Sequence, residues 1–104
     1  MKQFDIFVSY ISWGADGKKR PVLVYALNNE FVRVYPITTQ YENKSQAIKA
    51  KYFKINDWAQ AGLVSQSYVD TGTRFNQALS IFENDTPVGS LSNADKQRLI
   101  EFLK

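Results

Sequence analysis

Two short segments contain the residue types best suited to hold a phosphate group. In the first, Lys18, Lys19 and Arg20 lead directly into Pro21 and an apolar strand. Proline is tolerated at the first position of a strand and pushes the preceding residue towards an extended backbone. We therefore expect the Arg20 guanidinium at the rim of a rigid sheet, where it can bind two phosphate oxygens at once.

The second segment follows another apolar strand and reads Pro36, Ile37, Thr38, Thr39 and Gln40. Threonines in strands usually reflect β propensity, but a hydroxyl at the end of a strand can also donate to a phosphate oxygen. Either segment taken alone is explained by an ordinary surface role. Both together favour a site for an anion.

The amino-acid composition excludes several kinds of catalytic site. The 104 residues include no cysteine and no histidine. Disulfides, thiolate nucleophiles, Ser-His-Asp triads and zinc sites with sulfur or imidazole ligands are therefore impossible, and only an oxygen-only metal site would remain. We expect no metal and no cofactor, so catalysis would depend on arginine, lysine, hydroxyl, phenol or carboxylate groups.

The positive charge is concentrated in one part of the chain. Residues 18 to 54 carry eight lysines and arginines against two glutamates, whereas the remainder carries five basic and eight acidic residues. A basic segment that contains both candidate motifs suits an anionic ligand. A solvated face with an excess of lysine would give the same bias.

Length and hydropathy predict one domain over residues 1–104. Hydrophobic residues make up 44% of the chain, enough for a single core, and no break in composition divides it. No run reaches the ~18 apolar residues of a membrane helix, and the N-terminus lacks the apolar segment of a signal peptide. A cytoplasmic protein without membrane contact is expected.

Period-two alternation or a continuous apolar run predicts most of the chain as strands. The predicted extended segments span residues 3–12, 21–27, 31–37, 46–54, 65–69 and 74–82. Glycines and polar residues predict loops over 13–19 and 41–45 and a tight hairpin turn at 28–30.

Helical signals are confined to the second half of the chain. Asn56 and Asp57 can cap a short helix over 58–61 that Gly62 would end, while Ser92 and Asp95 imitate a capping box before a helix that runs to the C-terminus. The predicted fold class is therefore mainly β (α+β). It is a small curled antiparallel barrel with a short helix and a docked C-terminal helix.

The two phosphate-binding segments, in this order and at this spacing, resemble the MazF/PemK family of toxin ribonucleases. The resemblance covers nearly the whole chain, and the stretch 88–92 is similar to the glycine-leucine segment before that family's last helix. It implies an SH3-like barrel, a homodimer and a toxin of a type II toxin–antitoxin system. The implied activity is metal-independent cleavage of single-stranded RNA (mRNA), and the implied protein partner is an acidic antitoxin.

The resemblance also implies roles for individual residues. The implied catalytic residues are Arg20 and Thr38. The family has a glutamate five residues before the arginine, and this position is Ala15 here. The adjacent Asp16 is the candidate substitute for that glutamate. Of the aromatic residues, Tyr41 is the one expected to be exposed for stacking on a base. The residues expected to contact RNA are Lys18, Lys19, Thr39, Gln40, Tyr41, Lys49, Lys51 and Ser67.

The departure at Ala15 leaves two other functions open. Gyrase-binding toxins of the CcdB type share the barrel and act by binding a protein, without cleaving RNA. A small SH3-like adaptor without toxicity is the third possibility. Cleavage of RNA, inhibition of DNA supercoiling and growth after forced expression separate the three.

Overall fold

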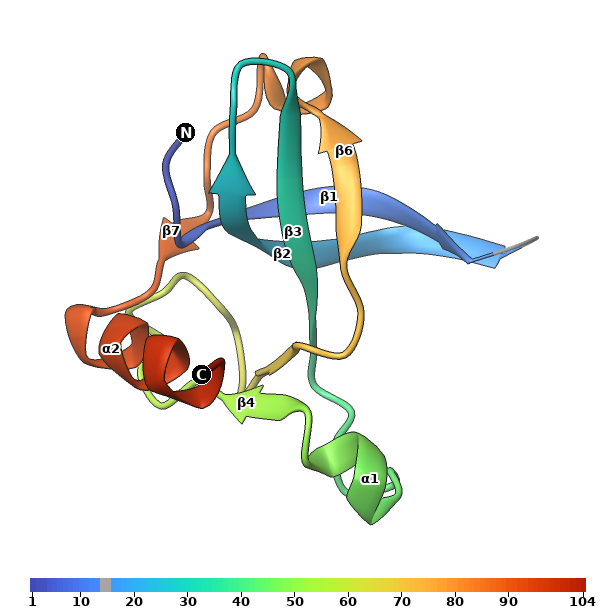
Figure 1. Cartoon of the computed structure of the whole chain (residues 1–104), viewed down its shortest axis with the longest axis vertical. Helices are drawn as coiled ribbons and strands as arrows, with labels where there is room; N and C mark the ends of the chain where they lie inside the picture. The colour runs from blue at the N-terminus through green and yellow to red at the C-terminus, as the bar shows by residue number, and fades with distance from the viewer. Residues whose placement is uncertain (14–15) are drawn as a thin grey trace.

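The fold is mainly β, as expected from the sequence. The computed structural model describes the backbone of residues 1–13 and 16–104 and the side chains of residues 1–10 and 17–104. Within these residues, seven antiparallel strands form one curled sheet with two α-helices and a short 3-10 helix, η1 (Figure 1). The elements are β1 (Asp5–Trp13), β2 (Asp16–Leu27), β3 (Phe31–Thr38), α1 (Gln46–Lys49), β4 (Tyr52–Lys54), β5 (Tyr68–Asp70), β6 (Phe75–Ala78), η1 (Leu79–Phe82), β7 (Gly89–Ser90) and α2 (Asn93–Phe102).

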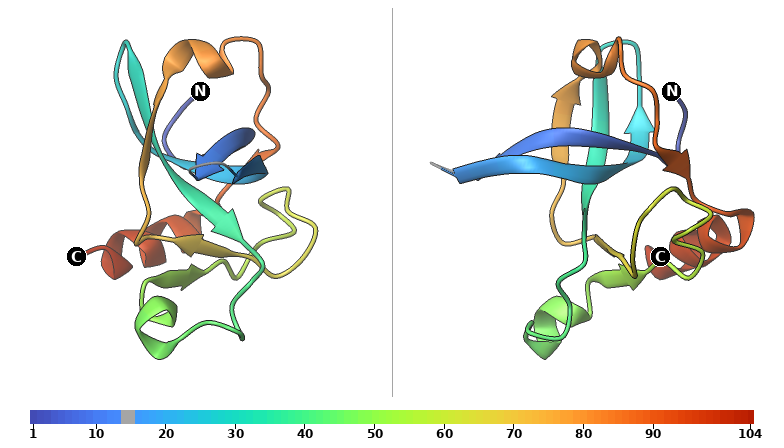
Figure 2. Two further views of the ribbon diagram at one scale, coloured as in Figure 1. Left: turned by 90° about the vertical axis from the view of Figure 1, so that its right-hand side faces the viewer. Right: turned by 180° about the vertical axis from the view of Figure 1, so that it is seen from behind.

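The central strand, β3, explains how the sheet curls. The strand order is β4-β5-β3-β2-β1-β7, and β6 also pairs with β3. The first half of β3 pairs with β6 and its last two residues pair with β5, so one edge of β3 serves two partners in succession. Its other edge pairs with β2, whose first part runs with β1 as a ribbon that extends beyond the rest of the sheet (Figures 1 and 2).

The two faces of the β2–β3 hairpin are buried by different parts of the chain, because successive side chains in a strand point to opposite faces. On one face, Leu23, Tyr35 and Ile37 join a core that includes Leu99 of α2. On the other face, valines of both strands form a second core with Phe7 and Phe82. This second core ends before the last residues of β3, so the same face is available there for polar side chains.

A β-bulge interrupts the pairing of β2 with β3. Ala26 pairs with Arg33, but Val24 pairs with Val34, so Tyr25 is an extra residue on β2. Such a residue shifts the alignment of everything that precedes it on its strand by one position. The predicted turn at 28–30 is confirmed, since Asn28 Oδ1 accepts hydrogen bonds from two backbone N–H groups of that turn.

The predicted loop over 13–19 is wrong for residue 13 and residues 16–19, which are strand, while residues 14 and 15 lie outside the described residues. The β1–β2 ladder continues to the pair Trp13 and Asp16, so residues 17–19 belong to β2. Gly17 leaves room for the Tyr10 ring, because a Cβ atom at this position would lie 2.6 Å from the Tyr10 hydroxyl oxygen. The glycine that suggested a loop therefore accommodates an aromatic ring across the ladder.

The predicted strand over 46–54 is also wrong in its first half. Ser45 Oγ accepts a hydrogen bond from Ile48 N–H at 3.3 Å and caps α1, so only Tyr52–Lys54 is extended. Glutamine, alanine and lysine are good helix formers, and the serine cap decided the local structure. The apparent alternation depended on Ile48, which is exposed.

The predicted helix over 58–61 is wrong, because these residues form turns, although Gly62 has the left-handed φ of +89° that suits a residue ending a helical turn. Two predicted strands are shorter than expected. The extended segments near 65–69 and 74–82 contract to β5 and β6, and η1 follows β6. None of the helices in the described residues has the length and apolar character needed to cross a membrane.

The start of α2 is fixed by two side chains with different roles. Ser92 Oγ accepts a hydrogen bond from Asp95 N–H at 3.1 Å, as the capping prediction requires. The Asp95 carboxylate does not complete the box. It is fully buried, accepts hydrogen bonds from the backbone N–H groups of Asn56 and Asp57 at 3.4 and 2.8 Å, and pairs with Arg98 at 2.6 Å. Asp95 therefore joins α2 to the segment after β4.

Replacing Asp95 with asparagine is expected to lower the free energy of unfolding by about 3 kcal/mol, because it leaves Arg98 without its buried partner. Urea unfolding at neutral pH measures this change. Glu101→Gln is the matched control, since Glu101 pairs with Lys104 on the surface and its loss should change stability by less than about 1 kcal/mol. Equal unfolding midpoints for the two variants would show that the Asp95 contacts do not stabilise the fold.

Candidate active site

A small polar cleft lies where β2, β3, β4 and β5 come together. Its volume is about 180 Å³. The two residues expected to be catalytic and described with their side chains, Arg20 and Thr38, both line it. The complete lining is Arg20, Pro36, Thr38, Gln40, Lys44, Tyr52 and Asp70.

The register of β2 and β3 explains why Arg20 and Thr38 meet. The β2–β3 ladder ends at the pair Val22 and Pro36, and Arg20 and Thr38 each lie two residues beyond it on their own strand, at matching positions of the same alignment. Residues that are directly opposite in an antiparallel pair point to the same face. Without the extra residue Tyr25, the alignment would set Thr39 opposite Arg20 instead.

Arg20 is held firmly at the cleft. Its side chain is half-buried, and its Nε atom is inaccessible to solvent. Pro21 follows it and is itself half-buried, but the expected position of Pro21 at the start of a strand is wrong, because β2 begins at Asp16 and Pro21 pairs with Val8 in its interior. A guanidinium fixed in this way needs little further ordering to bind an anion.

Thr38 presents a hydroxyl donor to the same cleft. Its Oγ1 accepts a hydrogen bond from Gln40 N–H at 3.0 Å. A hydroxyl that accepts in this way still has its own proton to donate. Thr39 is exposed and does not line the cleft, whereas Gln40 does.

Asp70 and Tyr52 form a directly opposed pair across β4 and β5. Asp70 Oδ1 accepts a hydrogen bond from Gly72 N–H at 2.9 Å, which fixes the carboxylate in a tight turn. Burial raises the pKa of Tyr52 above its ordinary value of 10, the charge of Asp70 raises it further, and Arg20 lowers it. The phenol is therefore neutral near pH 7 and can donate a hydrogen bond or a proton.

The lysines are distributed differently from the sequence expectation. Lys44, which was assigned to a loop, lines the cleft. Lys18 and Lys19 are exposed on the projecting ribbon and do not line it. Lys51 is exposed, and its side chain lies beside Gly72, next to the Asp70 turn. These three outer lysines can still attract a polyanion, but Lys44 is the one that can contact it inside the cleft.

Tyr41 and Lys49 are already engaged with other side chains. The Tyr41 ring stacks on Tyr68 with 4.3 Å between centroids and 9° between planes. Lys49 Nζ lies 5.0 Å from the centre of the Tyr41 ring and 3.7 Å from a Glu42 carboxylate oxygen, and only 18% of its side chain is exposed. Tyr41 is therefore half-buried, in contrast to the open stacking platform expected from the sequence.

Ser67 and Asp16 are the remaining residues that the sequence places at the site. Ser67 is 3% exposed, and its hydroxyl donates to the Ser65 carbonyl at 2.9 Å, so it is not presented to a ligand. The expectation that Ser67 contacts RNA is therefore wrong. The Asp16 side chain and Ala15 lie outside the described residues.

The cleft contains a complete set of groups for binding and transforming a phosphodiester. Arg20 and Lys44 supply positive charge, Thr38 and the neutral Tyr52 supply donors, and Asp70 supplies a proton acceptor. Among the described residues, no three acidic side chains lie close enough together to hold a metal ion. No protein-family model matches the chain, and no curated protein matches it in sequence.

Proposed function

We propose that this chain is a metal-independent endoribonuclease that cleaves single-stranded RNA, and that it acts as the toxin of a type II toxin–antitoxin system. The observation that carries the proposal is that Arg20 and Thr38 line one cleft together with Asp70. Their positions on three different strands make this convergence a property of the fold. The resemblance to MazF/PemK toxins supports the same reaction.

The reaction would use the 2′-hydroxyl of the substrate as nucleophile. Asp70 accepts the proton of that hydroxyl while the bond from the 2′-oxygen to phosphorus forms. Arg20 and Lys44 stabilise the charge on the five-coordinate phosphorus, and Thr38 donates to one of its oxygens. The bond from phosphorus to the 5′-oxygen breaks, and Tyr52 protonates the departing oxygen. The products are a 2′,3′-cyclic phosphate and a 5′-hydroxyl.

Incubation of the purified protein with single-stranded RNA in excess EDTA tests the proposed function. We expect cleavage with a 2′,3′-cyclic phosphate on one product, and no cleavage where the scissile nucleotide carries a 2′-deoxyribose. RNA that remains intact under all conditions would overturn the proposal. Inhibition of DNA gyrase without RNA cleavage would indicate the protein-binding alternative instead.

An acidic antitoxin is the partner that suits the charge of this site. The segment from residue 18 to 54, which carries a net charge of +6 by the count given above, contributes most of the cleft lining. A carboxylate-rich peptide laid across Arg20 and Lys44 would exclude RNA by occupying the same place. A homodimer in the cytoplasm is part of the same proposal.

Replacing Thr38 with valine is expected to lower the cleavage rate by about 10- to 100-fold, because the transition state loses a hydrogen bond to a charged oxygen. Valine preserves the shape of threonine, so stability should change little. Thr39→Val is the matched control, since Thr39 is adjacent in sequence but does not line the cleft. Rates that fall equally in both variants would show that the Thr38 hydroxyl has no special role.

A further inference from the structure

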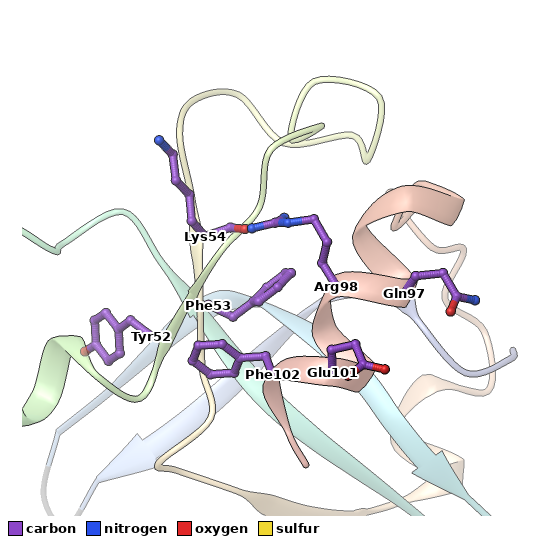
Figure 3. Close-up of a pocket in the computed structure, with 7 residues that line it drawn as sticks. All are labelled: Tyr52, Phe53, Lys54, Gln97, Arg98, Glu101 and Phe102. Carbon is purple, nitrogen blue, oxygen red and sulfur yellow. The ribbon is translucent and has the colours of Figure 1, made fainter.

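A second, larger cavity adjoins the polar cleft. It lies between β4 and α2 and has a volume of about 670 Å³ (Figure 3). Tyr52 belongs to the lining of both this groove and the polar cleft, and its ring points away from Phe53 and Arg98 (Figure 3), so the two spaces lie on either side of β4. The groove is lined by Tyr52, Phe53, Lys54, Gln97, Arg98, Glu101 and Phe102.

The inner wall of the groove is aromatic. Phe102 of α2 is 41% exposed, although it is a large apolar side chain near the end of a helix. Its ring lies edge-on to Phe53, with 5.5 Å between centroids and 69° between planes (Figure 3). Phe53 is buried and belongs to the core, so it supports Phe102 from behind. An exposed ring held in this way can stack on a flat ligand.

Arg98 makes the groove rigid on its other side. Its guanidinium carbon lies 4.7 Å from the centre of the Phe53 ring, and its Nη1 donates to Asp95 at 2.6 Å and to the Lys54 carbonyl at 3.1 Å. Because these contacts fix the guanidinium, the groove needs little rearrangement to receive a ligand.

The rim of the groove carries groups that can read the edge of a base. Gln97 offers both an amide donor and an acceptor, Glu101 offers acceptors, and Lys54 offers a donor. All three side chains are exposed. Bases in single-stranded RNA are recognised by this combination of an aromatic surface with nearby polar side chains.

We propose that this groove binds the base of the nucleotide next to the scissile phosphate and sets the sequence preference of cleavage. The inference rests on the proposed function of the polar cleft. The shared residue Tyr52 is the reason for choosing this occupant. β4 is at the edge of the sheet, so a single nucleotide can pass over that edge with its phosphate in the cleft and the adjoining base in the groove.

The experiment tests whether the effect of Phe102 on KM requires one particular base of the RNA. RNA oligonucleotides that carry an abasic ribose at each position flanking the cleavage site are compared with the intact oligonucleotide. For the wild-type protein, we expect one abasic position to raise KM by about 5- to 150-fold, the range of one lost stacking contact. In Phe102→Ala, KM for the intact RNA should rise by the same factor, and the abasic position should have no further effect.

Ile100→Ala is the matched control, because Ile100 lies on the same helix, is 40% exposed and does not line the groove. It should behave as the wild type does. Phe102→Leu provides a second variant should the alanine variant fold poorly, since leucine keeps the apolar contact with Phe53 but removes the ring. It should show the same insensitivity to the abasic position.

The outcomes distinguish this inference from the proposed function. Suppose that the wild-type protein cleaves RNA, but that the factor by which Phe102→Ala raises KM is the same with and without each abasic position. The groove is then not a base site, and the proposal that the cleft cleaves RNA still stands. If the wild-type protein cleaves no RNA, the proposed function fails and this inference fails with it.

Discussion

Replacing Arg20 with alanine is expected to lower the rate of RNA cleavage by about 10²–10³-fold, the loss typical of removing a positioned transition-state donor. The side chain is half-buried and belongs to the interior of β2, where Arg20 pairs with Ser9 of β1, so we expect the transition state to meet a guanidinium that is already oriented. Single-turnover cleavage of an oligonucleotide measures the chemical step separately from binding. Toxicity on expression should be lost in parallel.

Arg74→Ala is the control for the Arg20 variant. Arg74 is exposed and lines a different pocket with Arg33 and Asn76, so its replacement removes the same charge from another place. If general attraction of RNA were all that Arg20 supplied, the two variants would have similar rates. A rate that falls only in Arg20→Ala requires contact with the reacting phosphate.

Replacing Asp70 with asparagine should lower the cleavage rate by about 10²–10⁴-fold, the usual contribution of a general base. Asparagine retains an oxygen that can accept the hydrogen bond from Gly72, so the turn should remain intact. It cannot accept the proton of the 2′-hydroxyl. RNA binding should be preserved, and a filter-binding assay beside the kinetic measurement separates the two effects.

Asp85→Asn serves as the control for Asp70, since Asp85 is an exposed carboxylate that does not line the cleft. Its cleavage rate should equal that of the wild type. Full activity of Asp70→Asn, together with loss of activity in Asp16→Asn, would place the proton acceptor at the residue expected from the sequence.

The strands that the sequence predicts well are those whose central residues are buried on both faces. Residues 21–27 and 31–37 are apolar in a pattern that only paired strands between two cores can use, and β2 and β3 contain them. The segment 46–54 was predicted wrongly because one exposed apolar residue, Ile48, completed a false alternation. Local hydrogen bonding by Ser45 outweighed that pattern.

The candidate site was predictable only where its residues are close in sequence order. Arg20 and Thr38 belong to consecutive strands of one hairpin, which makes their approach readable from the two motifs. Tyr52 and Asp70 reach the cleft through the pairing of β3 with β5 and of β5 with β4, an order that no local pattern encodes, and Lys44 reaches it from the loop that follows β3. The sequence contains one weak indication for Tyr52. Phe53 follows it in the predicted strand, so if Phe53 faces the core, Tyr52 faces the other side of the sheet.

The bulge at Tyr25 links the hydrophobic residues of this hairpin to the make-up of the polar cleft. If the bulge were absorbed into regular pairing, β2 would slip by one residue and Thr39 would replace Thr38 beside the guanidinium. The same slip would turn Val22 and Val24 out of their core, at a loss of about 1.5–3 kcal/mol for each side chain exposed. Side chains that do not line the cleft thus determine which of two adjacent threonines lies beside Arg20.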